Sequence, residues 1–173
     1  MAKPPLEHPA LHHLRVTPDI VLELMEGLSD EHAQAKDDPV AYSLAEFLEY
    51  ISHREAHCFR AWLDILLSGG KSPLPLYDRP AYFSTGAYSG REPEESLAHW
   101  EERRDDNLEL LENLTQTDLA KSAPLPSGAT ATLDDVLREW AAQDLTAIRQ
   151  IAEYTSVFLY PRTGLFVGKL GAK

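Results

Sequence analysis

The chain has 173 residues, of which 43% are hydrophobic, and this is enough for one domain with a full apolar core. Its 28 acidic and 16 basic residues give a net charge of −12. Such an excess of negative charge argues against binding to nucleic acids or to anionic membranes.

Cys58 is the only cysteine, so an intrachain disulfide is excluded and a reducing compartment is favoured. The opening MAKPPLEHPALHHL does not resemble a signal peptide. No stretch reaches the roughly 18 apolar residues of a membrane span. These features predict a soluble, cytoplasmic protein with a single domain, residues 1–173.

The first of four segments with helical periodicity is expected to begin at Thr17 and Pro18. Threonine caps the free amides of a helix start, and proline suits the first turn. The apolar side of this helix is expected to contain Ile20, Val21, Leu24 and Leu28.

The other three helices have clearer boundaries. Ser43 and Glu46 form a capping box that opens the second helix, which is expected to end at Ser68-Gly69-Gly70. The third is expected to begin near Pro93, and the fourth after Thr132, capped together with Asp135.

Residues 69–93 form a long connection between the second and third helices, and residues 121–131 form a second loop. Four amphipathic segments with one long crossover predict an all-α four-helix bundle. Its core is expected to span about residues 17–155. The tail, residues 156–173, is expected to pack on the bundle or on a second subunit.

Three ions interrupt the apolar stripes of these helices. At about 100° per residue, Glu55, Arg104 and Asp144 fall inside the stripes of the second, third and fourth helices, each near the midpoint. We expect them to share one polar layer, since one guanidinium can bond two carboxylates. The layer is either a structural network that fixes helix register or the polar floor of a ligand pocket.

The segment HREAH places His53 and His57 four residues apart, a spacing that often holds a metal ion on one helix face. On the helical wheel both fall outside the apolar arc. They are therefore either solvated residues on the flank of the helix, or two ligands of a metal site completed by Asp144 or Gln143 from the fourth helix.

The chain resembles the DinB-like superfamily, which includes the YfiT-type metal-dependent hydrolases, over about residues 17–155. Three segments carry the resemblance: AYSLAEFLEYISHREAH, SLAHWEERRDDNLELLENLTQTDL and TLDDVLREWAAQDLTAIRQI. In the family, the second helix opens with Trp-Ser and then carries a Glu, a metal-binding His and a second Glu. Tyr42-Ser43, Glu46 and Glu55 stand at the matching positions of this chain.

The fourth helix of the family typically reads His-Asp-x-x-His, and here that stretch is QDLTA, residues 143–147. Members with all three histidines bind a divalent metal, often nickel or zinc. The matching positions here carry Tyr50, Gln143 and Ala147, which are poor ligands or none. The resemblance therefore predicts a pocket at these residues without a bound metal or other cofactor, and a homodimer.

Three functions are compatible with this pattern. The first is a small-molecule-binding bundle that has lost the metal triad. The second is a hydrolase, or a thiol S-transferase acting on bacillithiol or mycothiol, with zinc or nickel held at His53, His57 and Asp144. The third is a dimeric structural or regulatory subunit without a ligand. The crossover aromatics Tyr77, Tyr82, Phe83 and Tyr88 are expected either to cover the pocket or to pack simply within the loop.

Overall fold

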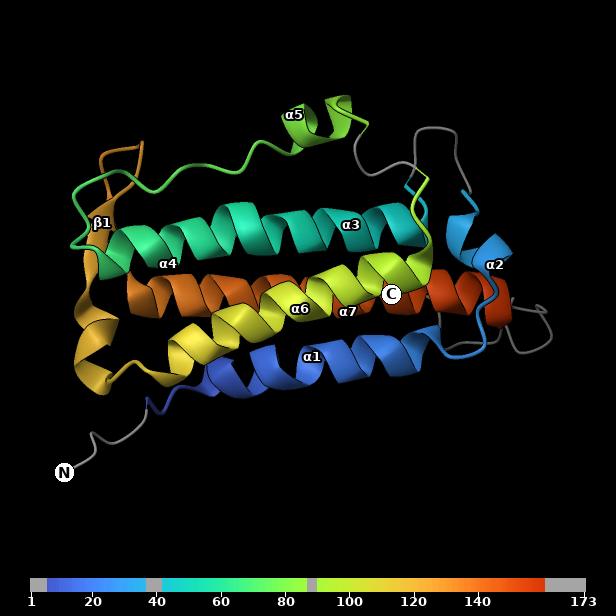
Figure 1. Ribbon diagram of the computed structural model, residues 1–173, viewed down its shortest axis with the longest axis horizontal. Coiled ribbons are helices and arrows are strands. Elements are labelled where there is room, and N and C mark those ends of the chain that lie inside the picture. Colours follow the sequence, from blue (N-terminus) through green and yellow to red (C-terminus); the bar gives the residue numbers. More distant parts are fainter. Residues whose placement is uncertain (1–5, 37–41, 87–89, 161–173) are drawn as a thin grey trace, which may run out of the picture.

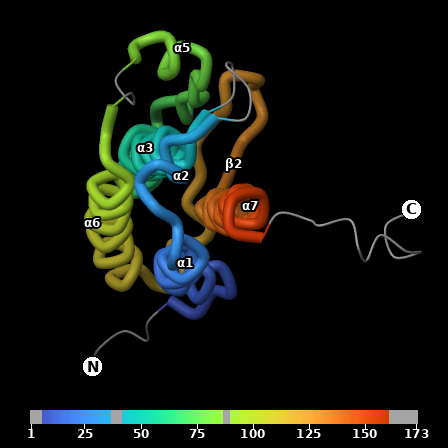
Figure 2. The backbone as a smooth tube through the Cα atoms, turned by 90° about the vertical axis from the view of Figure 1, so that its right-hand side faces the viewer, coloured from blue at the N-terminus to red at the C-terminus, as the bar shows by residue number. Residues whose placement is uncertain are grey.

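The computed structural model describes residues 6–36, 42–86 and 90–160. Four long helical rods lie side by side, and their end view shows one rod at each corner (Figures 1 and 2). The rods are α1 (Pro9–Met25), the continuous segment α3 (Leu44–Arg54), η1 (Glu55–Phe59) and α4 (Arg60–Leu67), then α6 (Pro93–Glu112) and α7 (Leu133–Leu159). The predicted four-helix bundle is confirmed.

Smaller elements connect the rods. They are α2 (Asp30–Gln34), α5 (Arg79–Ser84) in the long crossover, the 3-10 helix η2 (Gln116–Ala120), and the strands β1 (Ser122–Pro124) and β2 (Thr130–Thr132). The strands pair antiparallel in a small hairpin, so the prediction of a plain loop over residues 121–131 was wrong. Three-residue strands are too short to show a period of two in the sequence.

The predicted start of the first helix was also wrong. The helix begins at Pro9, where the Nδ1 atom of His8 accepts a hydrogen bond from the Ala10 amide at 3.1 Å. Thr17 and Pro18 lie inside it, and the Thr17 hydroxyl donates to the His13 carbonyl. Its buried face includes Leu14, Thr17 and Val21, whereas Ile20 is 38% exposed. The bundle core therefore begins before the predicted residue 17 and includes Leu6, Ala10 and Leu11.

The other predicted helix boundaries are confirmed. Capping boxes open α3 at Ser43 and α7 at Thr132, and α6 begins at Pro93. The second rod ends at Leu67, just before the predicted stop. Gly70 is required after it, because its φ is +64° and a Cβ atom there would lie 1.9 Å from the Ser122 carbonyl oxygen.

The four rods do not pack equally. α1 packs most closely on α7, and α3 packs most closely on α6, whereas α3 and α7 approach each other at few points. The crossover that carries α5 runs along the outside of α3 (Figure 1). Among the described residues, no helix is long and apolar enough to span a lipid bilayer. The predicted tail lies outside the described residues from 161 onward.

Candidate functional site

The buried guanidinium of Arg104 lies between the carboxylates of Glu55 and Asp144. Arg104 donates from Nε and Nη2 to Glu55 at 2.7 and 3.1 Å, and from Nη1 and Nη2 to Asp144 at 2.7 and 2.8 Å. Nη1 also donates to the Leu14 carbonyl at 2.8 Å. These five bonds use all five N–H groups of an arginine. The structure thus brings the three predicted ions into one layer.

The Leu14 carbonyl is available to Arg104 for a local reason. In an α-helix this oxygen would accept from the amide four residues later, but that residue is Pro18, which has no amide hydrogen. The proline that was taken for a helix start therefore lies inside the helix, and the carbonyl that it leaves without a helical donor faces the buried cation.

The surroundings of the layer complete its hydrogen bonding. Glu55 accepts further bonds from Trp140 Nε1 and Asn107 Nδ2, both at 3.2 Å. The rings of Trp100 and Trp140 lie 5.3 and 5.5 Å from the guanidinium carbon. Burial alone would lower the pKa of Arg104, but the two carboxylates outweigh it and hold the pKa above its ordinary value. The layer is a paired, buried network, and it offers no free carboxylate to a ligand.

The second rod changes its winding at Glu55. Residues Glu55–Phe59 form a π-helical turn, in which the Arg60 amide donates to the Glu55 carbonyl five residues back. Such turns insert one residue into an α-helix and often mark functional sites. The turn places His57 on the exposed surface and leaves His53 half-buried, with their ring centroids 4.1 Å apart.

The two histidines do not meet Asp144. Nδ1 of His53 lies 2.8 Å from the Tyr77 hydroxyl, whereas both oxygens of Asp144 accept bonds from Arg104. Within the described ranges, no three His, Cys, Asp or Glu side chains are grouped so that they could hold a metal ion. The alternative site at His53, His57 and Asp144 is therefore not assembled.

His53 is expected to make the stability of the fold depend on pH. Burial, reinforced by the charges of His57 and Arg103, lowers the pKa of His53 from 6.5 to about 4. Between these values the unfolded chain binds more protons, so the free energy of unfolding should fall as pH drops through this window. His53→Asn should flatten that dependence in urea titrations, whereas the exposed His12→Asn should not. An unchanged slope in His53→Asn would contradict the shift.

Tyr50 is buried at the centre of an aromatic cluster built by the crossover. The rings of Tyr77, Tyr82 and Phe83 lie 5.9, 6.3 and 5.4 Å from the Tyr50 ring. These three rings therefore cover Tyr50, while Tyr88 lies outside the described residues. The cluster packs directly onto Tyr50, which is only 8% exposed.

Arg54 joins Tyr50 to the fourth helix. Its Nη1 donates to Oε1 of Gln143 at 2.8 Å, and its guanidinium carbon lies 5.6 Å from the Tyr50 ring and 5.2 Å from the Phe59 ring. Gln143 in turn donates to Glu139 at 2.6 Å. Ala147, one turn along α7, is buried and offers no donor or acceptor in its side chain.

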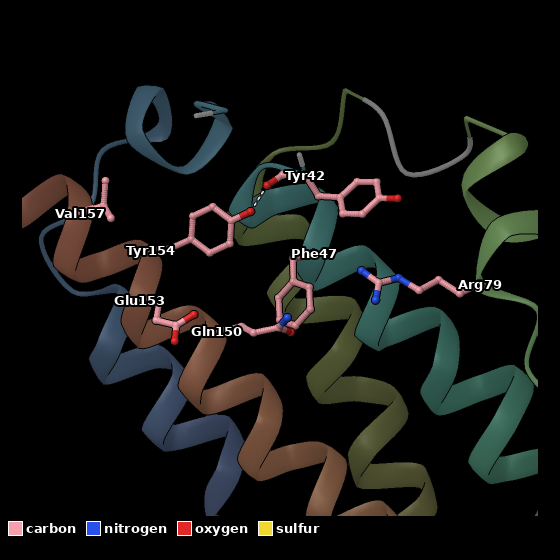
Figure 3. A pocket seen from close by; sticks show the side chains of 7 residues that line it. All are labelled: Tyr42, Phe47, Arg79, Gln150, Glu153, Tyr154 and Val157. Atoms are coloured by element: carbon pink, nitrogen blue, oxygen red, sulfur yellow. Dashed lines mark hydrogen bonds between the residues drawn. The ribbon is translucent and has the colours of Figure 1, made fainter. Parts of the chain in front are cut away.

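A pocket of about 230 Å³ opens between α3 and α7, which approach each other at few points. Figure 3 shows its lining, which consists of Tyr42, Phe47, Arg79, Gln150, Glu153, Tyr154 and Val157. The Tyr154 hydroxyl donates to the Tyr42 carbonyl across it. Tyr50, Gln143 and Ala147, at which the sequence predicted a pocket, are not among the lining residues. Arg79 was not singled out in the sequence, because it lies in a connection without periodicity.

Comparison with known proteins identifies the family of this bundle. The model of the DinB superfamily matches residues 13–150. The chain belongs to the DinB superfamily. YfiT from Bacillus subtilis, described as a probable metal-dependent hydrolase with an unusual four-helix bundle topology, has a similar structure, with a TM-score of 0.74. The match covers 90% of this chain and 93% of YfiT at 16% identity, which shows a shared fold. No curated protein matches the chain.

The residues of this DinB protein do not fit the metal centre that the family resemblance implies. Of the three matching positions, Tyr50 is enclosed by rings, Gln143 is bonded to a guanidinium, and Ala147 has no donor atom. A divalent ion needs several converging donors and is repelled by a neighbouring cation. Arg54, which lies between the two histidines in the sequence, contacts two of the three positions.

Cys58 does not supply a nucleophile to this region. It is 2% exposed and lies in the apolar core. Burial raises the pKa of its thiol to about 11, although Arg54 opposes the shift. Since the thiolate is the reactive form, this cysteine is inert near neutral pH.

Proposed function

We propose that this DinB protein binds a small molecule without a metal ion, in the pocket between α3 and α7. The observation that carries the proposal is the bond from Arg54 to Gln143, which puts a cation of the protein beside two of the positions where metal-binding members carry histidines. The side chains there are already bonded to one another, so we assign the ligand to the neighbouring pocket between the same two helices.

The composition of the pocket supports this function. Small-molecule sites combine apolar walls with a few polar groups that fix orientation. Here Phe47, Tyr154 and Val157 provide apolar surface, while Arg79 and Gln150 provide polar groups. The pocket lies at a seam between helices, which is a common place for ligand sites in bundles.

A fragment screen tests this proposal. Fragments that bind the pocket should raise the melting temperature of the wild-type protein and lose that effect in Val157→Trp, because the larger side chain fills the pocket. Leu145→Trp is the matched control, since Leu145 is 52% exposed on the same helix and does not line the pocket. A screen in which no fragment distinguishes Val157→Trp from the control contradicts the proposal.

A further inference from the structure

Arg79 is the one cation among the described residues that line the pocket. Its guanidinium points from the α5 segment toward Tyr42 and Phe47 (Figure 3). No carboxylate in the described ranges forms an ion pair with it, whereas most other arginines of this acidic chain have such a partner or a hydrogen-bonded side chain.

Aromatic rings hold the Arg79 guanidinium in place. Its carbon lies 4.8 Å from the centroid of Tyr50 and 5.5 Å from the centroids of Tyr42 and Phe83. Cation–π contacts of this kind engage the face of the planar group, while its N–H donors lie in the plane at its edge. These contacts leave the N–H donors of Arg79 unused, and because Arg79 is exposed a ligand can reach them.

The acidic residue of the pocket does not cancel this charge directly. Glu153 accepts a hydrogen bond from Arg149 at 2.8 Å along the same helix. That ion pair engages Glu153, and no carboxylate of the described residues pairs with Arg79. A planar guanidinium with accessible edge donors can make two parallel bonds to a carboxylate or to a phosphate.

The size of the pocket limits the rest of the ligand. Its volume of about 230 Å³ is below the roughly 300–1,000 Å³ typical of sites for drug-sized molecules. Three of the other lining residues, Phe47, Tyr154 and Val157, are aromatic or aliphatic. We infer that the ligand is a small carboxylic acid with about one apolar ring, whose carboxylate binds Arg79. This inference rests on the proposed function and adds the ligand class.

Titrations with benzoate, benzyl alcohol and inorganic phosphate, followed by amide chemical shifts at constant ionic strength, test the inference. Benzoate should shift resonances of Gln150 and Tyr154 and bind at least about tenfold more tightly than the other two, because only benzoate combines the carboxylate with a ring. Arg79→Gln should reduce benzoate affinity to the level of benzyl alcohol. Arg60→Gln, which removes an exposed arginine from α4, should leave it unchanged.

Each alternative result has a distinct meaning. Equal binding of benzoate and benzyl alcohol, or an unchanged benzoate affinity in Arg79→Gln, overturns the ligand class while the proposed function stands. Phosphate binding as strong as that of benzoate overturns the requirement for a ring. If none of the three probes shifts the pocket resonances, the ligand class is overturned, and the fragment screen decides separately whether the pocket binds small molecules.

Discussion

Replacing Arg104 by methionine is expected to destabilise the fold by about 3–5 kcal/mol, because the substitution leaves two buried carboxylates without a counter-charge. Glu55 and Asp144 are 1% and 5% exposed and lie on opposite sides of the guanidinium. Glu55 would keep bonds from Trp140 and Asn107, but no other described residue donates a side-chain hydrogen bond to Asp144. Urea unfolding followed by circular dichroism measures the change in the free energy of unfolding.

Two further variants identify the cause. Arg103→Met removes the adjacent, half-exposed arginine, whose bond is to the Ser52 hydroxyl, and should cost less than about 1 kcal/mol. Combining Arg104→Met with Glu55→Leu and Asp144→Leu should recover part of the loss, since an apolar replacement of a whole buried network is often tolerated. If Arg104→Met costs no more than Arg103→Met, the layer does not stabilise the fold as described.

Restoring the family's histidines is expected to create a metal site only when Arg54 is removed as well. The triple variant Tyr50→His, Gln143→His, Ala147→His supplies three imidazoles, which suit nickel or zinc. Arg54, which now bonds to Gln143, would place a guanidinium against the incoming divalent ion. Adding Arg54→Ala should strengthen nickel binding at least about tenfold, because a like charge a few ångströms away costs several kcal/mol at an effective dielectric constant of about 20.

Isothermal titration with nickel measures this difference, and Arg60→Ala in the same triple background is the control for lost positive charge. Arg60 pairs with Asp64 on the exposed surface of α4. Equal nickel affinity with and without Arg54 would show that the guanidinium does not compete with a metal at these positions.

The helices and the ionic layer could be predicted because both depend on local spacing. Capping residues such as Ser43 and Thr132 mark helix starts through hydrogen bonds within three residues. Glu55, Arg104 and Asp144 each interrupt an apolar stripe, and rods of similar length bring such interruptions to one level. The layer therefore followed from helical periodicity and from the requirement that buried charges be paired.

The first helix start could not be predicted, since a proline after a threonine is typical of an N-terminus. Pro18 is compatible with a position inside α1 because Arg104, which is distant in the sequence, donates a hydrogen bond to the Leu14 carbonyl. The π-helical turn was missed for a related reason. At this turn Glu55 bonds to Arg104 of α6 and to Trp140 of α7. A helical wheel assumes a fixed angle per residue, so it cannot show a change in helix winding.

The cavity lies between α3 and α7, and its lining does not include the residues at which the sequence predicted a pocket. Tyr50 and Gln143 are covered by contacts with Arg54 and with the crossover rings, and the fold of a connection without periodicity is not visible in the sequence. Arg79 reaches the pocket from that same connection. The homodimer and the cytoplasmic location stay predictions.

Metal content is the most direct test of the claim that this bundle works without a metal ion. Protein without a histidine tag would be incubated with zinc and nickel, separated from free ions, and measured by elemental mass spectrometry. The account predicts far less than one ion per chain, because Arg54 and the aromatic cluster occupy the positions around Tyr50 and Gln143. About one tightly held ion per chain, lost in His53→Ala, would contradict it.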